Sequence, residues 1–543
     1  MNKWIPFCLL FLASCAQIVP PSGGRPDKTP PFPKSYTPDS AATLFHSKTV
    51  EIEFDEYIVL KDLNSQLIIS PPMDKQPIIK VKNKSLSIEF REPLKDSTTY
   101  TINFGNAIQD LHENNPISNF RYVFSTGSYV DSLALTGNVL NALTLVPEKG
   151  VLVMLYDKLM DSVPYKRLPS YFGRTDANGN YRITNIKPST YKLFALKDGN
   201  GNYKFNEGEL SGFKNQNLVL THNDTANFLI YTEKPHKQYL RKAYQAGCGK
   251  IVLVFNKPVE DLKLRALNFQ PGPEHKTFVE RNEAGDSLVY WFTPSSSDSL
   301  ILEVGAKDKR IDTLRYKLIS YDKMLAQRKG QKASLSVKVN AGRGLFDLNS
   351  PITFEFDNPV TDLTQAETKI ALTEDTLKGN LMNAGLIKAL HPERNLRYYS
   401  WKDSLHPLKE KGKYKLYLAP KSFKDIYGFY NDTVKINFHM QELKYYGTLK
   451  LNIHIAAGHY VLQLLDEQDG VAREVKVSSN KELFFEYLPP AKYRLRFIYD
   501  SNNNGKWDPG DYLQKIQPEH VLYYIQPVTI RSNWDQEVDW YIK

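Results

Sequence analysis

Cysteine is scarce in this chain, with three residues among 543. Cys8 lies in an N-terminal targeting segment, so the mature chain keeps no pair of thiols free for an internal disulfide bond. A metal centre built from several thiolates is excluded for the same reason. We expect Cys248 to be a buried and unreactive thiol.

Long hydrophobic runs are missing as well. The apolar run from Ile5 to Ala13 is too short to cross a membrane as a mature helix, and no other stretch approaches the roughly 18 apolar residues that a crossing requires. Apolar residues make up 41% of the chain and aromatic residues 12%, which excludes a disordered chain. The many Tyr, Phe, Thr, Val and Ile residues in short runs favour β structure.

The sequence also lacks the motifs of common enzyme classes. It has no Gly-x-Ser-x-Gly elbow, no His-Glu-x-x-His pair and no phosphate-binding Gly-Lys-Ser/Thr loop. The acidic pairs Asp55-Glu56 and Glu207/Glu209 could flank a glycosidic bond, but carboxylates at strand ends are more typical of solvated turns. We predict that the protein is not an enzyme, with a glycan-active hydrolase as the least favoured alternative.

Charge of one sign is not concentrated in any segment. The formal net charge of +10 is spread over 70 basic and 60 acidic residues, and the densest basic stretches, 237–242 and 409–415, carry only a few charges each. A nucleic-acid-binding face would require a basic cluster on one surface. The composition therefore predicts a mixed, solvated surface and no nucleic-acid partner.

The N-terminus carries the clearest address signal. Lys3 precedes the apolar run, which ends in small residues as Leu12-Ala13-Ser14-Cys15. This segment resembles the lipobox of bacterial lipoproteins, which implies a signal peptide over residues 1–15 and acylation of Cys15. Several acyl chains, at about 0.8 kcal/mol per buried CH₂, would anchor the protein stably. Ala16 rather than Asp follows, and by resemblance to the sorting rule of Gram-negative lipoproteins this implies the outer membrane, on either face.

Residues 16–29 are interpreted as a tether. They are rich in proline and glycine, as in Pro20-Pro21-Ser22-Gly23-Gly24, and such a composition stays extended rather than packing a core. The segment resembles the tethers of Bacteroidetes envelope lipoproteins. The resemblance implies a membrane partner through the lipid anchor.

Three later segments share one pattern at the end of an alternating strand: Glu53-Phe54-Asp55, Val254-Phe255-Asn256 and Glu355-Phe356-Asp357. Pro93-Leu94-Lys95 precedes Tyr100 as Pro407-Leu408-Lys409 precedes Tyr414, and a turn at Asp110 returns at Asp425. The first of these units resembles the SbsA-type bacterial Ig-like domain. The resemblance implies antiparallel β-sandwiches with structural and spacing roles and no catalytic motif.

A second kind of module occurs twice. Its first copy has the turn Asp176-Ala-Asn-Gly179 and the run Pro188-Ser-Thr-Tyr191, and its second copy has Pro490-Ala-Lys-Tyr493 but Ser478-Ser479-Asn480 in place of the turn. These copies resemble the carboxypeptidase-regulatory-like, or prealbumin-like, sandwich. There the Asp-x-x-Gly turn opens a hairpin, which the resemblance implies for the first copy.

A polar loop follows the Tyr strand in both copies. We call residues 198–209 loop 1 and residues 500–511 loop 2, and we number the positions of each from 1 to 12. A calcium-binding loop takes its ligands from positions 1, 3, 5, 7, 9 and 12. These positions hold Asp198, Asn200, Asn202, Lys204 (carbonyl), Asn206 and Glu209 in loop 1, and Asp500, Asn502, Asn504, Lys506 (carbonyl), Asp508 and Asp511 in loop 2.

Position 6 of such a loop favours glycine, which loop 2 supplies as Gly505, whereas loop 1 has Tyr203. With only two and three carboxylates, the loops predict weak Ca²⁺ binding, on the order of 10⁻⁴–10⁻³ M, that would stiffen the loop rather than catalyse. The alternative is that Asp, Asn and Gly serve only as turn residues here.

The sequence predicts an all-β protein, a string of antiparallel β-sandwich modules, that acts as a non-enzymatic, lipid-anchored scaffold of the cell envelope. The alternative is a surface lipoprotein that binds a carbohydrate or a peptide, with an envelope protein or a glycan as partner. The predicted ranges are Ig-like modules at 30–127, 236–330 and 331–440 and prealbumin-like modules at 128–235 and 441–543.

Overall fold

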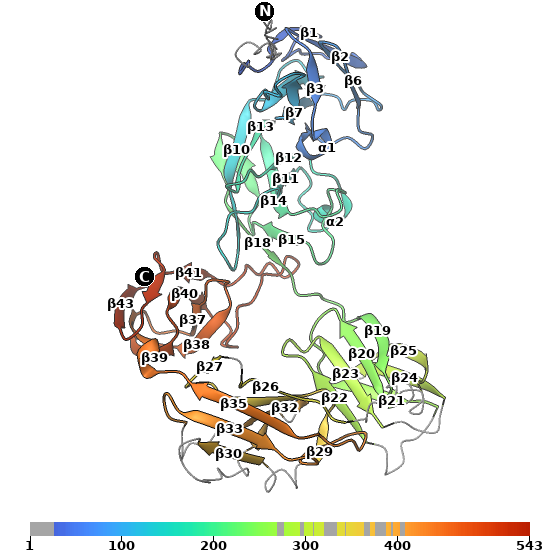
Figure 1. Ribbon diagram of the computed structural model, residues 1–543. Helices are drawn as coiled ribbons and strands as arrows, with labels where there is room; N and C mark the ends of the chain where they lie inside the picture. The colour runs from blue at the N-terminus through green and yellow to red at the C-terminus, as the bar shows by residue number, and fades with distance from the viewer. Residues whose placement is uncertain are drawn as a thin grey trace, which may run out of the picture. The chain divides into compact units, whose positions relative to one another are not determined.

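The computed structural model describes residues 27–542, with gaps at 269–275, 294–297, 308, 320–333, 343, 363–369, 375–386, 392–394 and 402–407. The predicted signal peptide, Cys15 and most of the predicted tether lie outside the described residues. The predicted all-β fold class is confirmed (Figure 1). Helix in the described part of the chain is confined to α1 (Leu63–Gln66), α2 (Val163–Lys166) and a 3-10 turn, η2 (Leu443–Tyr445).

The chain divides into two compact units, Met1–Asn141 with Val146–Ile230, and Ala142–Leu145 with Tyr231–Lys543. None of the helices in the described residues has the length and apolar character that a membrane crossing requires. The strands of the first unit are β1 (Pro33–Thr37), β2 (Thr49–Phe54), β3 (Ile58–Leu60), β4 (Ile68–Ser70), β5 (Ile78–Lys82), β6 (Ser85–Glu89), β7 (Thr99–Gly105), β8 (Ile108–Asp110), β9 (Phe120–Ser125), β10 (Leu133–Asn141), β11 (Leu152–Tyr156), β12 (Tyr171–Arg174), β13 (Asn180–Ile186), β14 (Ser189–Leu196), β15 (Leu210–Phe213), β16 (Leu218–Leu220), β17 (Asp224–Thr225) and β18 (Phe228–Thr232).

The second unit continues the all-β pattern. Its strands are β19 (Leu240–Gly247), β20 (Lys250–Phe255), β21 (Leu262–Ala266), β22 (Thr277–Arg281), β23 (Ser287–Phe292), β24 (Ser299–Ala306), β25 (Lys309–Lys317), β26 (Val337–Val339), β27 (Leu345–Phe346), β28 (Ile352–Phe356), β29 (Val360–Asp362), β30 (Ile370–Glu374), β31 (Ile387–His391), β32 (Asn395–Trp401), β33 (Lys413–Leu418), β34 (Lys424–Asp425), β35 (Val434–Met440), β36 (Gly447–His454), β37 (Tyr460–Leu465), β38 (Val471–Val477), β39 (Lys481–Leu488), β40 (Ala491–Tyr499), β41 (Val521–Tyr523), β42 (Val528–Ile530) and β43 (Asp535–Tyr541).

Three sheets share one strand order. They run β1-β2-β6-β5 in the first unit, and β19-β20-β23-β22 and β26-β28-β32-β31 in the second. The repeated Phe54, Phe255 and Phe356 end the second strand of each sheet and are almost fully buried. Strand β2 alternates exposed and buried residues along its length, as expected for a sheet with one face on a core. The three repeated sequence segments therefore occupy the same place in three alike sheets.

The other repeated residues also make equivalent contacts. The Tyr100 hydroxyl accepts the Lys95 N–H at 2.8 Å, and the Tyr414 hydroxyl accepts the Lys409 N–H at 2.9 Å. Asp110 accepts backbone N–H groups of the turn that follows it, as does Asp425. These side chains tie a turn to the neighbouring strand in both modules, which explains why the sequence keeps their spacing.

The two modules predicted at 128–235 and 441–543 share a parallel strand pair. Strand β10 pairs in parallel with β18, and β36 pairs in parallel with β43. The Tyr191 hydroxyl donates to the carbonyl of Lys187, four residues back, and Tyr493 does the same to Pro489. Tyr191 lies in β14 and Tyr493 in β40, and these strands lead directly into loop 1 and loop 2.

The hairpin expected at Asp176 is not formed. The turn itself is present, because Oδ1 of Asp176 accepts the N–H groups of Asn178 and Asn180 at 2.9 Å and Gly179 has a φ of +75°. The strands that it joins pair elsewhere, β12 with β11 and β13 with β10. The turn therefore carries the chain from one part of the sandwich to another, and tertiary packing overrides the local signal.

Buried apolar side chains gather into one main cluster in each predicted module. They span Phe45 to Phe124, Leu135 to Ile230, Ile251 to Val304, Leu335 to Met440 and Leu449 to Trp540. Cys248 is buried and carries a free thiol whose pKa is raised by burial. The exact module boundaries stay a prediction.

Candidate functional site

Loop 1 is a chain of turns organised around its first residue. Oδ1 of Asp198 accepts the N–H groups of Asn200 and Gly201, and Oδ2 accepts the N–H of Tyr203 at 2.8 Å. The side-chain oxygens of Asn200 and Asn202 each accept the N–H two residues further on. The polar residues of positions 1, 3 and 5 therefore serve the loop's own backbone, as Asx turns do.

Glu209 at position 12 closes loop 1. Its Oε1 accepts the Gly199 N–H at 3.0 Å, and its Oε2 accepts the Asn206 N–H at 2.9 Å. The amide nitrogen of Asn206 donates to the carbonyl of Lys204, the residue expected to ligate through that oxygen. One carboxylate thus ties position 2 to position 9.

Loop 2 repeats this design around a more deeply buried residue. Asp500 is 2% exposed, and its two oxygens accept the N–H groups of Asn504 at 2.9 Å and Gly505 at 2.7 Å. The oxygen of Asn502 accepts the Asn504 N–H, and that of Asn504 accepts the Lys506 N–H. Position 1 therefore accepts the N–H of position 6 in both loops.

The carboxylate that closes loop 2 lies outside the predicted ligand set. Oε1 of Glu519 accepts the N–H of Ser501, at position 2, and Oε2 accepts the N–H of Asp508, at position 9, at 2.8 and 2.9 Å. Asp511, at position 12, is predicted as a Ca²⁺ ligand, and in the structure its Oδ1 accepts the N–H of Gln514 at 2.9 Å.

Position 6 has the same backbone conformation in both loops. Gly505 has a φ of +77°, which glycine adopts freely, and Tyr203 has a φ of +57°, which costs a side chain about 1–2 kcal/mol. The ring of Tyr203 packs edge-on against Phe172 at 5.1 Å between ring centres. The tyrosine at position 6 is thus accommodated without a change in the loop's path.

An aromatic residue at position 8 attaches each loop to the module that carries it. Phe205 is buried against Tyr165 and Phe194. Trp507 donates its indole N–H to the carbonyl of Glu519 at 3.0 Å. The loop ends are therefore held by apolar packing in addition to the carboxylates.

Loop 2 alone brings the side chains of positions 3, 5 and 9 together. The Nδ2 atoms of Asn502 and Asn504 each lie 2.5 Å from Oδ2 of Asp508, and the Lys234 ammonium forms an ion pair with the same carboxylate. Burial raises the pKa of Asp508, but the hydrogen bonds from Lys234, Asn502 and Asn504 outweigh burial and hold the pKa below its usual value.

This donor set fits a hard cation better in loop 2 than in loop 1. The oxygens of both amides are suitable Ca²⁺ ligands, and each would have to turn toward the ion and give up the backbone N–H that it now accepts. In loop 1 the amide of Asn206 turns to the backbone carbonyl of Lys204 instead. No group of three His, Cys, Asp or Glu side chains placed to hold a metal occurs among the described residues, so amides and carbonyls would have to complete either site.

Loop 2 also contacts the segment that follows β18. Glu233, 8% exposed, accepts the Tyr512 N–H at 2.7 Å, and Lys234 reaches Asp508. Nε2 of His236 lies 3.8 Å from Oδ2 of Asp511. Asp511 therefore faces this segment, and we call the contacts of 233–236 with loop 2 and Tyr512 the linker clasp.

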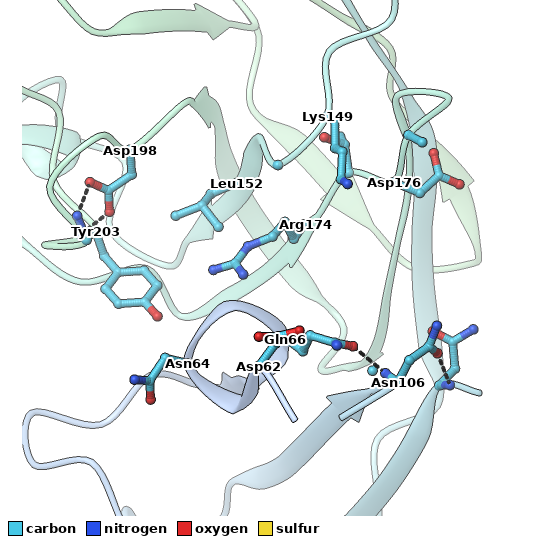
Figure 2. Close-up of a pocket in the computed structure, with 16 residues that line it drawn as sticks. Asp62, Asn64, Gln66, Asn106, Lys149, Leu152, Arg174, Asp176, Asp198 and Tyr203 are labelled. Atoms are coloured by element: carbon cyan, nitrogen blue, oxygen red, sulfur yellow. Dashed lines mark hydrogen bonds between the residues drawn. The ribbon is translucent and has the colours of Figure 1, made fainter. Parts of the chain in front are cut away.

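A polar cleft lies in the first unit beside loop 1 (Figure 2). It has a volume of about 870 Å³ and opens to solvent. Residues between Asp62 and Asn119 form one side, and residues between Lys149 and Tyr203 form the other. Its lining includes Asp62, Asn64, Gln66, Asn106, Lys149, Leu152, Arg174, Asp176, Asp198 and Tyr203.

Residues 27–126 match the family model of the bacterial Ig-like domain. This match confirms the Ig-like resemblance for the first module and covers less than half of the chain. No curated protein matches the sequence.

Several solved structures resemble parts of the chain at low identity. The major pilin subunit BcpA of Bacillus cereus is 10% identical over 76% of this chain and 99% of its own, with a TM-score of 0.14. The S-layer protein SbsC is 11% identical over 90% and 66%, with a TM-score of 0.14, and the Bacillus anthracis TIE protein is 10% identical over 96% and 76%, with a TM-score of 0.15. Such low TM-scores establish no common arrangement of modules.

Proposed function

We propose that the protein is a non-enzymatic scaffold of the bacterial cell envelope, built from β-sandwich modules and anchored by lipid at Cys15. The observation that supports this best is a joint within the second unit. There the hydroxyl of Tyr427 donates to the carbonyls of Cys248 and Gly249, at 3.0 and 3.1 Å. The half-buried Tyr427 of the predicted module 331–440 thus packs against a turn of the preceding predicted module, 236–330.

Buried charge strengthens the same joint. Oε2 of Glu280 accepts the indole N–H of Trp291 at 2.8 Å, and its Oε1 lies 3.6 Å from a guanidinium nitrogen of Arg397. Lys250 lies over the Trp291 ring at 4.4 Å, and burial lowers the pKa of its ammonium. Buried polar networks favour one arrangement of the parts they join, which suits a load-carrying or spacing role.

Loosening the joint tests the scaffold. In Tyr427→Phe both hydrogen bonds are lost while the ring is kept, and small-angle scattering of the variant should show a broader range of module arrangements. Tyr417→Phe, at an exposed tyrosine of the same predicted module, is the matched control. Unchanged scattering in Tyr427→Phe would count against a fixed joint.

The anchor is tested by Cys15→Ser. We expect the Cys15→Ser protein to leave the membrane fraction. The Cys8→Ser protein should remain there, because Cys8 is removed with the signal peptide. A Cys15→Ser protein that still partitions with outer membranes would contradict lipid anchoring.

We also propose that loop 2 binds Ca²⁺ weakly and is stiffened by it. Asn502, Asn504 and Asp508 would hold the ion, together with carbonyl oxygens of the loop. Isothermal titration of the full chain with CaCl₂ tests the proposal, with Asp508→Asn as the variant that should lose the heat signal. Equal heats from both proteins would contradict a site in loop 2.

A further inference from the structure

We propose that the cleft of the first unit is a binding site for an oligosaccharide. The proposal is independent of the scaffold function, because it concerns what the first two modules bind rather than how the protein is anchored. It rests on three observations, which are the fixed walls of the cleft, the kind of side chains that line it, and the aromatic ring beside it.

The two walls are fixed to each other by buried hydrogen bonds. Asp131 receives a hydrogen bond from the Thr99 hydroxyl at 2.8 Å, and both residues are at least 95% buried. The amide of Asn185 donates to the carbonyl of Asp131 at 2.8 Å and accepts from Thr101 at 3.3 Å. A cleft between walls that are already joined requires little rearrangement on binding, and this lowers the cost of association.

The lining suits a ligand with many hydroxyl groups. Amide side chains, which donate and accept at once, come from Asn64, Gln66 and Asn106, and Lys149 and Arg174 add charged donors. Sugar hydroxyls also donate and accept at once, so neighbouring amides can pair with neighbouring hydroxyls. An apolar ligand would leave these groups without partners, which costs about 1–3 kcal/mol for each buried group.

The carboxylates of the lining are largely engaged by the protein itself. Asp198 accepts three backbone N–H groups of loop 1, and Asp176 accepts two from its own turn. Asp62, the third carboxylate of the lining, also interacts with the rest of the protein. The cleft therefore combines amides and basic side chains with carboxylates that already have partners in the protein, a lining that suits recognition of a polar ligand.

The side chain of Gln66 lies close to the backbone at the edge of the cleft, because residue 105 is a glycine. Gln66 accepts the Asn106 N–H at 2.6 Å, and a Cβ on Gly105 would lie 2.9 Å from the same Gln66 oxygen. Gly105 has a φ of +56°, so a side chain here would be both strained and obstructed. The glutamine is thus fixed at the edge of the cleft rather than free to rotate.

Tyr203 supplies the aromatic surface. Its ring extends from loop 1 toward the α1 side of the cleft, as does the guanidinium of Arg174 (Figure 2). The left-handed backbone at this tyrosine belongs to the turn that Gly505 also forms in loop 2, and in loop 1 it places the ring beside the cleft. An aromatic ring beside hydrogen-bonding groups offers the apolar face of a sugar ring a packing surface.

The test is binding of the full mature chain to an oligosaccharide array, followed by titration calorimetry with the strongest binder. Neutral oligosaccharides and tetragalacturonate form separate arms. Binding in the neutral arm alone assigns recognition to the amides and the ring, and binding in the acidic arm assigns it to Lys149 and Arg174 as well. Either result supports the proposal.

Matched variants locate the binding. Tyr203→Asn removes the ring and keeps a residue that tolerates a positive φ, and Asn64→Ala alters an exposed lining residue. Both should weaken binding, Tyr203→Asn by about tenfold. Tyr129→Asn, at an exposed tyrosine outside the lining, should bind as the parent does. Binding to no glycan, or equal binding by all four proteins, would overturn the proposal.

Discussion

Loop 1 and loop 2 have equivalent hydrogen bonds at positions 1, 2, 6 and 9, but their closing carboxylates come from different places in the chain. Glu209 closes loop 1 from position 12, and Glu519 closes loop 2 from eight residues beyond Asp511. The contact is kept while the residue that makes it has moved. Both copies of the module therefore keep a carboxylate that accepts the N–H groups of positions 2 and 9, whichever residue supplies it.

The two loops also differ in what surrounds them. Loop 2 is the more buried, with Asp500 2% and Glu519 8% exposed, and it holds residues 233–236 in the linker clasp. Loop 1 is more open and borders the polar cleft. One loop design thus serves as an internal contact in one module and as the edge of a cleft in the other.

The largest expected effect is that of removing a closing carboxylate. In Glu519→Gln an amide N–H₂ replaces one of the two acceptor oxygens of a buried carboxylate, which should cost about 2–3 kcal/mol of local stability. Glu209→Gln should cost about 1 kcal/mol, because water can replace the lost contact at a more exposed site. Native-state hydrogen exchange of each module measures both values. Equal losses of stability in the two variants would show that the deeper burial of Glu519 does not make its hydrogen bonds more costly to lose.

The next effect concerns position 6. Gly505→Ala places a side chain at a φ of +77° and should cost about 1–2 kcal/mol, since only the flexible end of Lys476 must move away. Tyr203→Gly removes the corresponding strain in loop 1 but also the ring that packs on Phe172, so its net effect should be smaller. Urea unfolding followed by tryptophan fluorescence measures the loss of stability in the predicted module 441–543, which holds loop 2 and which we call the fifth module. A Gly505→Ala protein as stable as the parent would contradict a fixed left-handed turn.

Calcium should stabilise loop 2 and not loop 1, and by less than the substitutions above change stability. At a concentration about tenfold above its dissociation constant, Ca²⁺ would stabilise loop 2 by about 1.4 kcal/mol. The melting transition of the fifth module should therefore rise in Ca²⁺ relative to chelator, and Asp508→Asn should abolish the rise. Asn206→Asp in loop 1 is the complementary variant, because it adds at position 9 the carboxylate that loop 2 already has. A rise that persists in Asp508→Asn would place the ion elsewhere.

The smallest effect is a pH dependence of the linker clasp. Burial raises the pKa of Glu233, and the N–H of Tyr512 offsets this only in part. The folded state therefore favours the protonated acid, so its contribution is fully present below about pH 4.3 and is lost as pH rises through the raised pKa. Glu233→Gln keeps an acceptor oxygen for Tyr512 and removes the charge.

This variant should match the parent near pH 4 and melt slightly higher than it near pH 8. The fifth-module melting temperature across this range provides the measurement. A variant that melts lower at pH 8 would mean that the Glu233 charge itself stabilises the clasp.

Much of the fold could be predicted because its signals are local. The alternation that ends in Phe54, Phe255 and Phe356, and the spacing to Tyr100 and Tyr414, reflect contacts made within one strand or one turn. The pairing of β12 and β13 could not be predicted, because it depends on which strands lie beside them in the sandwich.

The loops show the same limit at the level of single residues. Asp198 and Asp500 were found from the pattern because they bond to residues a few positions away. Glu519 was missed because a twelve-residue template ends before it, and Lys234 because it is 274 positions from Asp508. A search for any acidic residue shortly after loop 2 could have found the first, whereas only the folded chain reveals the second.

The central claim is that Glu519, and not Asp511, closes loop 2. Hydrogen–deuterium exchange at the backbone amides of Ser501 and Asp508 tests it directly, in the parent, Glu519→Gln and Asp511→Asn. We predict that at least one of the two amides loses protection in Glu519→Gln, which keeps a single acceptor oxygen, and that both keep it in Asp511→Asn. Protection lost in Asp511→Asn and retained in Glu519→Gln would contradict the account.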